Sequence, residues 1–149
     1  MKNKRFVVQE HETADGVHWD LMLESASGGS LTTFRLEEPP EQALGRPVRA
    51  EKIFDHPLRF LSYEGPVQKG TGRVHIVERG SWRPVGCDRR VVGANNHSPL
   101  RDGSLCAPPC RFILEGAILS GTFTLLRTSQ TQWCFVREDA GPDSRQLPR

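Results

Sequence analysis

Short runs of alternating apolar and polar residues, most of them bounded by glycine or proline, constrain the fold of this chain more than any other feature. Alternation with a period of two places successive side chains on opposite faces of an extended strand. Many short strands separated by turn residues are typical of an all-β sandwich or barrel. We therefore predict a compact, mainly antiparallel β-barrel of about eight strands with little helix. The expected strands are residues 5–10, 17–23, 31–36, 58–63, 72–78, 110–114, 121–127 and 132–136.

The length and charge of the chain fit one globular domain. Its 149 residues can bury one core, and the formal net charge of +2 argues against a polycation or an acidic disordered chain. We expect one barrel domain over residues 1–137, with a turn or two of helix near residues 41–44. Residues 89–109 are expected to form a long loop insert, and the polar residues 138–149 a disordered tail. No signal peptide or membrane span is apparent, so we expect a cytoplasmic protein.

The four cysteines are too few and too unevenly spaced for the disulfide framework of a small secreted domain. Reduced thiols are expected instead. Cys106 and Cys110 could supply two ligands to a structural zinc, completed by Cys87 and His97, since thiolate and imidazole suit tetrahedral zinc. The alternative is a proline-rich loop in which these cysteines are incidental.

The segment HETADGVHWDLMLE combines strand alternation with groups that bind metals. Alternation places Trp19, Leu21 and Leu23 on one face, while His18, Asp20, Met22 and Glu24 share the other. The pair His18 and Asp20, joined by His11, would form a two-histidine, one-carboxylate set that suits manganese, zinc or iron with open positions. The absence of a thiolate from this set favours manganese or zinc. Histidine and aspartate on the solvated face of a strand are also common without a metal.

Two further histidines are candidates for phosphate chemistry. His56 stands in DHPLRFLSYEG at a proline-marked position, where it could contact a phosphate or act as a general acid. His75 alternates with Val74 and Ile76, so it either joins the polar face as a phosphate contact or is a solvated strand histidine.

The order of several segments resembles one known family. FVVQEH, HWDLMLE, DHPLRFLSYEG, GTGRVHIVERGSW, FILEGAILSGTFTLLRT and WCFV follow one another from about Arg5 to Val136. In this order they resemble the 3'-phosphoesterase domain of bacterial DNA ligase D and its free-standing relatives.

The resemblance implies a compact β-barrel with a basic groove that trims DNA 3' ends by removing a terminal phosphate or ribonucleoside. It implies that His11, His18 and Asp20 bind manganese, that His56 contacts the phosphate and that Gln9 supports the site. A metal at such a site polarises a phosphate oxygen and lowers the pKa of bound water. Implied partners are DNA 3' ends and separate ligase or polymerase chains.

Three positions depart from the family pattern. The arginine that clamps the phosphate in the family corresponds to Met22, a tyrosine corresponds to Phe60, and an acidic residue corresponds to Phe54. These changes concern phosphate handling more than metal binding, since Met22 has no charge and Phe60 no hydroxyl. A neighbouring arginine could replace the missing clamp, and the candidates are Arg35, Arg59 and Arg73.

Three functions remain open at this stage. The first is a metal-dependent 3'-phosphoesterase in DNA repair. The second is a catalytically impaired module that keeps the metal and binds DNA ends or a repair partner. The third is hydrolysis of another phosphoester in a more apolar pocket formed by Met22 and Phe60.

Overall fold

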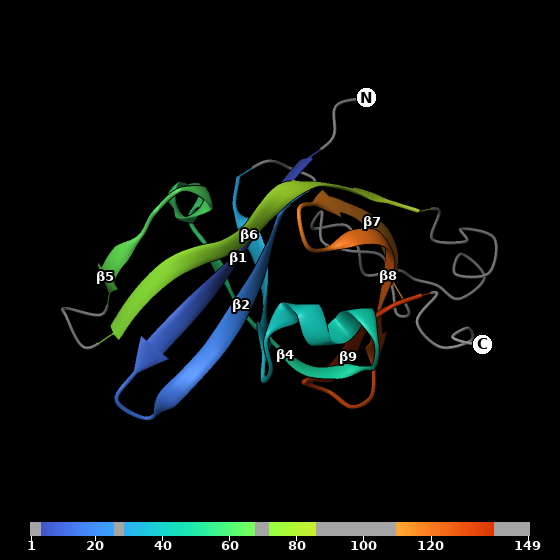
Figure 1. Ribbon diagram of the computed structural model, residues 1–149, viewed down its shortest axis with the longest axis horizontal. Helices are drawn as coiled ribbons and strands as arrows, with labels where there is room; N and C mark the ends of the chain where they lie inside the picture. The colour runs from blue at the N-terminus through green and yellow to red at the C-terminus, as the bar shows by residue number, and fades with distance from the viewer. Residues whose placement is uncertain (1–3, 26–28, 68–71, 86–109, 139–149) are drawn as a thin grey trace.

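The computed structural model describes residues 4–25, 29–67, 72–85 and 110–138. Within these ranges nine strands and two short 3₁₀ helices follow one another (Figure 1). No helix in the described ranges is long and apolar enough to cross a membrane. The elements are β1 (Lys4–Thr13), β2 (Gly16–Glu24), β3 (Leu31–Leu36), η1 (Pro40–Leu44), β4 (Val48–His56), η2 (Leu58–Leu61), β5 (Gly65–Val67), β6 (Gly72–Pro84), β7 (Cys110–Gly116), β8 (Ser120–Arg127) and β9 (Gln132–Arg137).

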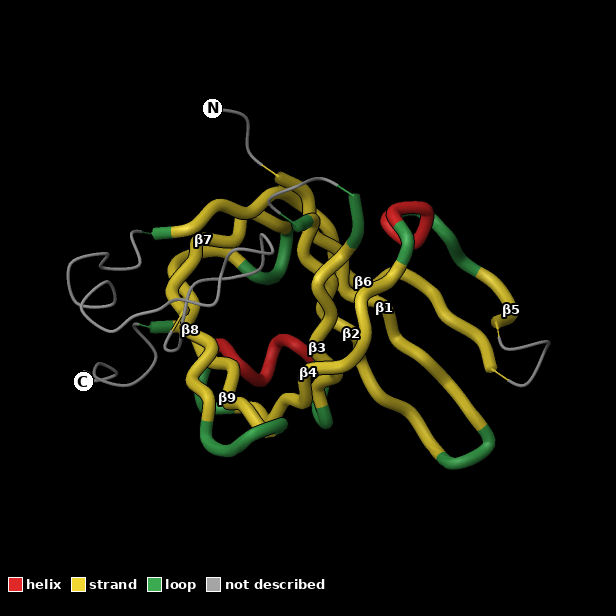
Figure 2. The backbone as a smooth tube through the Cα atoms, turned by 180° about the vertical axis from the view of Figure 1, so that it is seen from behind, coloured by secondary structure: helices red, strands yellow, loops and turns green. Residues whose placement is uncertain are grey.

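Eight of these strands close into an antiparallel barrel. Neighbouring strands pair in the order β1-β2-β3-β4-β9-β8-β7-β6, and β6 pairs in turn with β1. β6 has 13 residues, so its first part also pairs with β5 and its last part with β7. Figure 2 shows the ring, with the ends of β1, β2 and β6 extending beyond it toward β5. The predicted all-β barrel is confirmed.

One predicted strand was wrong, and the observed strand β4 was missed. Residues 58–63 do not form a strand, because Leu58–Leu61 form the 3₁₀ helix η2 directly after Pro57. β4 was not predicted, because charged residues interrupt its apolar positions and only Val48 and Ala50 are buried. Pairing with β3 on one edge and with β9 on the other stabilises β4 in spite of its weak pattern. The helical turn expected near residues 41–44 is present as η1.

Some predictions concern residues outside the described ranges. The loop insert at residues 89–109 lies there, as do Cys87, His97 and Cys106 of the alternative zinc site and nearly all of the tail at residues 138–149.

The barrel interior is filled by alternate positions of the strands. Leu21 and Leu23 are fully buried there, and Trp19 packs against the same core, as the alternation predicted. Large side chains from the other strands complete the core, among them Phe6, Phe34, Trp82, Phe112, Phe123 and Phe135.

A second, smaller apolar cluster lies on the outer face of the sheet. Val7, Met22 and Leu31 are fully buried in it, beneath partly buried side chains of η2. The prediction that Met22 belongs to a polar face was therefore wrong in part, because residues 57–67 cover the sheet at this point. We call residues 57–67 the covering segment. It contains η2 and β5.

A bulge in β6 brings a carboxylate into the barrel. The register with β1 shifts after Val8 and leaves Val77 without a partner in β1. The next residue, Glu78, is 4% exposed. Its two carboxylate oxygens accept hydrogen bonds from the backbone N–H groups of Arg79, Ala117, Ile118 and Leu119, at 3.1, 3.2, 2.6 and 2.6 Å. Glu78 therefore stabilises the turn between β7 and β8.

We expect Glu78→Ala to lower the free energy of unfolding by about 3 kcal/mol, because it leaves buried N–H groups without an acceptor. Urea titration of the purified protein measures this change. Glu115→Ala is the matched control, because Glu115 belongs to the same hairpin but is exposed. Within the described residues, its side chain accepts a hydrogen bond from Ser81 alone. The control should change stability by no more than about 0.5 kcal/mol. Equal effects of the two substitutions would contradict the structural role of Glu78.

Candidate functional site

The strand register places the predicted ligands on the outer face of the barrel. Asp20 lies opposite Gln9 of β1 and opposite Arg35 of β3, and His18 lies opposite His11. Residues directly opposite one another in an antiparallel pair project from the same face. Three adjacent strands therefore bring these five side chains together on the face that the covering segment flanks.

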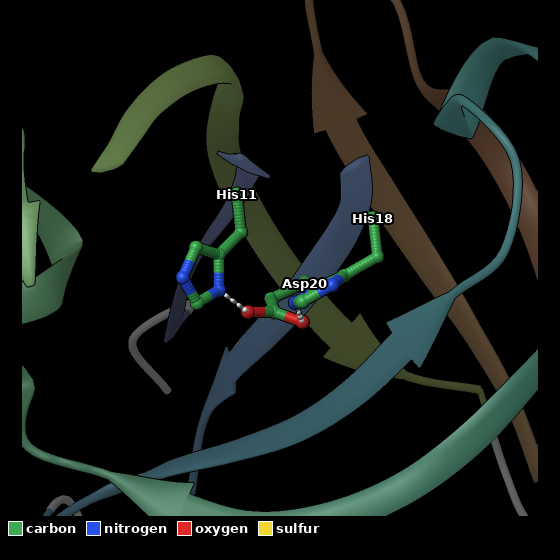
Figure 3. Close-up of side chains that lie close together, drawn as sticks. All are labelled: His11, His18 and Asp20. Carbon is green, nitrogen blue, oxygen red and sulfur yellow. Dashed lines mark ion pairs between the residues drawn. The ribbon is translucent and has the colours of Figure 1, made fainter. Parts of the chain in front are cut away.

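His11, His18 and Asp20 form a tight cluster in which each residue offers one ligand atom and all of these atoms lie within 4.8 Å of one another. Asp20 lies between the two imidazoles, with its carboxylate oxygens 3.8 Å from His11 Nδ1 and 3.6 Å from His18 Nε2 (Figure 3). The two imidazole rings meet edge to face, with centroids 4.6 Å apart. His11 and Asp20 are only 6% and 3% exposed.

The donors of this cluster fit a bound cation. His18 Nε2 and Asp20 Oδ1 are buried and lack a hydrogen-bond partner among the described residues. Buried polar atoms without partners cost about 1–3 kcal/mol each, and a shared ion would remove that cost. Burial lowers the pKa of His11, and the neighbouring His18 lowers it further. A lowered pKa keeps the His11 imidazole neutral at neutral pH, which is the form that binds metals.

Gly72 leaves the space that the His11 ring needs. It stands at the start of β6, next to β1. A Cβ atom on Gly72 would lie 2.8 Å from His11 Nε2 and 3.2 Å from the carbonyl oxygen of Glu12. Any larger residue must therefore displace the imidazole or the backbone of β1.

Gln9 connects the site to the covering segment. Its side-chain amide donates hydrogen bonds of 2.9 Å to the carbonyl oxygens of both Phe60 and Tyr63. The other amide atom, Gln9 Oε1, is buried and has no hydrogen-bond partner among the described residues. Gln9 therefore holds the covering segment against β1 and still offers one acceptor.

His56 is held in one tautomer by its neighbours. Thr33 Oγ1 donates a hydrogen bond to the carbonyl oxygen of Leu31, which leaves Oγ1 as an acceptor for His56 Nδ1 at 2.9 Å. The carbonyl oxygen of Phe54 is a second acceptor, 3.1 Å from the same nitrogen. Both contacts place the proton on Nδ1 and the lone pair on Nε2. Burial lowers the pKa of His56, so its imidazole is neutral at neutral pH.

A cavity of about 400 Å³ opens between the cluster and the covering segment. The predicted residues Gln9, His11, Asp20, His56 and Arg59 all line it. Apolar and aromatic side chains form most of the remaining wall, namely Phe54, Pro57, Phe60, Tyr63, Pro66, Val67 and Val74.

Two of the three candidate arginines lie close to this site. Arg35 Nε is 3.8 Å from Asp20 Oδ1, and its charge also lowers the pKa values of His11 and His56. The guanidinium of Arg59 lies 5.2 Å from the centroid of the Phe60 ring. Arg59 lines the cavity, whereas Arg35 lies beside Asp20 and does not line it.

Arg73 and His75 are not brought to the site. They lie opposite Glu12 and Glu10 of β1, whereas the next β1 residue toward the site, His11, lies opposite Val74. The two side chains therefore project from the other face of β6. His75 Nε2 pairs there with Glu10 Oε1 at 3.0 Å, so the predicted phosphate contact of His75 lacks support.

Three residues of the site were not predicted from the sequence. Thr33 orients His56, Gly72 accommodates His11, and Tyr63 lines the cavity. The contacts of Thr33 and Gly72 join strands distant in sequence, so no local pattern could predict them. Tyr63 could have been predicted from its position, because it is an aromatic residue three positions after Phe60 in the same motif. Its hydroxyl donates a hydrogen bond to the carbonyl oxygen of Pro66.

Comparison with known proteins identifies one family. The family model of the DNA ligase D 3'-phosphoesterase domain matches residues 9–127. The chain is also 32% identical, over 154 aligned positions, to the multifunctional non-homologous end joining protein LigD of Pseudomonas aeruginosa. That alignment covers 97% of this chain but only 16% of the relative, so the chain spans a small part of the relative's length. Every residue of the candidate site falls inside the matched range.

We expect Gly72→Ala to weaken binding of Mn²⁺ at least about tenfold, because the added methyl group displaces His11. Isothermal titration of the metal-free protein measures the affinity. Gly45→Ala is the matched control, because a Cβ at Gly45 meets nothing within 4 Å and its φ of −123° suits any residue. Unchanged affinity in Gly72→Ala would show that His11 is not a ligand.

Proposed function

The chain belongs to the family of the DNA ligase D 3'-phosphoesterase domain, and on this basis we propose that it is a divalent-metal-dependent phosphoesterase that acts at DNA 3' ends. Its substrates would be ends that carry a 3'-phosphate or a 3'-terminal ribonucleotide. The observation that supports this most directly is the cluster of His11, His18 and Asp20, in which His11 and Asp20 are buried and line the cavity.

We propose His11, His18 and Asp20 as the metal ligands and Mn²⁺ as the preferred ion, with Zn²⁺ as the alternative. Two imidazoles and one carboxylate leave open positions for water and substrate. When bound, a divalent ion polarises a phosphate oxygen and lowers the pKa of a water molecule.

His56 is the proposed proton-transfer residue. Its neutral imidazole has the lone pair on Nε2, so it accepts a proton from water that attacks the phosphorus. The imidazolium then donates that proton to the leaving oxygen. Gln9 positions the covering segment, and its free Oε1 accepts a hydrogen bond from a hydroxyl or water in the cavity.

Arg59 and Arg35 take the role of the phosphate clamp in this proposal. Negative charge that develops on the phosphate oxygens is offset by fixed cations at the edge of the cavity. Arg59 lines the cavity itself, and Arg35 is close enough to Asp20 to act on the same phosphate from β3.

A second function is favoured by the position of Met22. The side chain is fully buried in the outer apolar cluster and does not line the cavity. If Arg35 and Arg59 do not replace the family's clamp, the protein would bind DNA ends with its metal but without turnover. Tight, salt-sensitive binding without product would support this second function.

The biological role that we propose is based on the name of the relative. The relative is a multifunctional end-joining protein, and this chain matches only one part of it. We propose that this chain works in the cytoplasm with separate ligase or polymerase chains at the same DNA ends.

The first test is turnover of a DNA strand that ends in a 3'-phosphate or a single 3'-ribonucleotide, with Mn²⁺ present. We expect His18→Ala to lose at least about 100-fold in kcat/KM, because it removes a metal ligand. His75→Ala is the matched control, since this histidine projects from the other face, and it should stay within about twofold of the wild type. No product from the wild type, with bound metal confirmed by elemental analysis, would refute the enzymatic function and support the second one.

The second test separates the arginines. We expect Arg59→Gln to lower kcat/KM about tenfold or more, because one cation beside the phosphate is lost. Arg73→Gln removes the same charge from the other face of β6 and should have little effect. Equal activity of the two variants would mean that Arg59 is not part of the clamp.

A further inference from the structure

Phe54 is an exposed aromatic side chain at the cavity. It is 72% exposed, whereas the other exposed large apolar side chains of the described ranges, Val17, Ile118 and Leu126, are 40–47% exposed. A single exposed apolar residue needs no explanation by itself. Phe54 differs from the other three because it lines the same cavity as His11 and Asp20.

The Phe54 ring extends a series of aromatic contacts along the cavity wall. It stacks on the His56 imidazole with centroids 4.7 Å apart and an interplanar angle of 13°. His56 contacts Phe60 at 5.3 Å, and Phe60 stacks on Tyr63 at 5.6 Å. Because one face of Phe54 lies on His56 and the residue is 72% exposed, its other face is open to a flat ligand.

The surroundings of Phe54 favour a nucleobase over an apolar protein surface. In the sequence of β4, Phe54 stands between Lys52 and Asp55, two charged residues that pair with each other at 3.5 Å. Arg59 adds a cation to the same cavity. A flat ring beside a cation complements a nucleotide, whose base stacks while its phosphate is attracted to positive charge.

We propose that Phe54 is a stacking platform for an unpaired nucleobase at the 3' end that the protein processes. A base inside a duplex is covered on both faces, and a terminal base pair is held in the plane of its partner, whereas an unpaired terminal base is free to turn and stack on Phe54. The chain therefore prefers single-stranded 3' ends to base-paired ends, with little preference for base identity. This inference rests on the proposed function, because it places the base of the same substrate whose phosphate meets the metal ligands.

The test compares two single-stranded oligonucleotides with 3'-hydroxyl ends, which offer no phosphate to remove. One ends in the fluorescent base 2-aminopurine and the other in an abasic residue. We expect the wild type to bind the first strand about 5- to 100-fold more tightly, since stacking on an aromatic side chain contributes an affinity of this order. The emission of 2-aminopurine should fall on binding.

Four variants decide whether Phe54 is responsible. The quantity compared is the ratio of the affinity for the 2-aminopurine strand to the affinity for the abasic strand. Phe54→Ala and Phe54→Leu should bring this ratio close to one, because neither has a flat ring. Phe54→Trp should keep the ratio of the wild type. Leu126→Ala is the matched control, because it removes an exposed apolar side chain of β8 that does not line the cavity, and it should keep the full ratio. A wild-type ratio near one, or a ratio that Phe54→Ala leaves unchanged, would overturn the proposal.

Turnover of a 3'-phosphorylated strand is measured in parallel. Turnover without a base-dependent affinity would refute the stacking platform and leave the phosphoesterase function standing. A base-dependent affinity that needs Phe54, without turnover, would refute the phosphoesterase function and leave the platform standing.

Discussion

The pairing of β1 with two strands at once is the constraint on which the rest of the structure depends. β1 pairs with β2 along one edge and with β6 along the other, and the second pairing closes the barrel. Its inward side chains, Phe6 and Val8, fill the core, while Gln9 and His11 project outward to the site. A register shift of one residue would exchange the two faces, so the pairing that encloses the core also positions the proposed ligands.

The site combines two parts with different origins. The strands supply the cluster of His11, His18 and Asp20, whose positions are set by the register. The covering segment supplies Arg59 and the aromatic side chains of Phe60 and Tyr63. The Gln9 amide holds this segment through the carbonyl oxygens of Phe60 and Tyr63, which are 51 and 54 positions away in the sequence. Phe54 of β4 also lines the cavity, where it stacks on the His56 imidazole.

The sequence predicted the barrel and the cluster better than the phosphate contacts. Strong alternation in β2 placed Leu21 in the core and Asp20 on the opposite face, and the structure agrees. The pattern failed at Leu58–Leu61, because a short apolar run fits a strand and a 3₁₀ turn equally well. For His75 the pattern left two interpretations open, because alternation does not show which face of the barrel carries a residue; its exposed side chain, paired with Glu10, favours the solvated strand histidine.

The sequence by itself therefore determined the all-β class and the inward face of β2, because these depend on local periodicity. Residue types and the family resemblance also singled out His11, His18 and Asp20, which the structure brings together. Only the tertiary structure decided that Thr33 orients His56, that Gly72 accommodates His11 and that Arg59 rather than Arg73 lines the cavity. The physical reason is that these contacts join segments distant in the chain. Their geometry depends on strand register, on barrel closure and on the path of the covering segment.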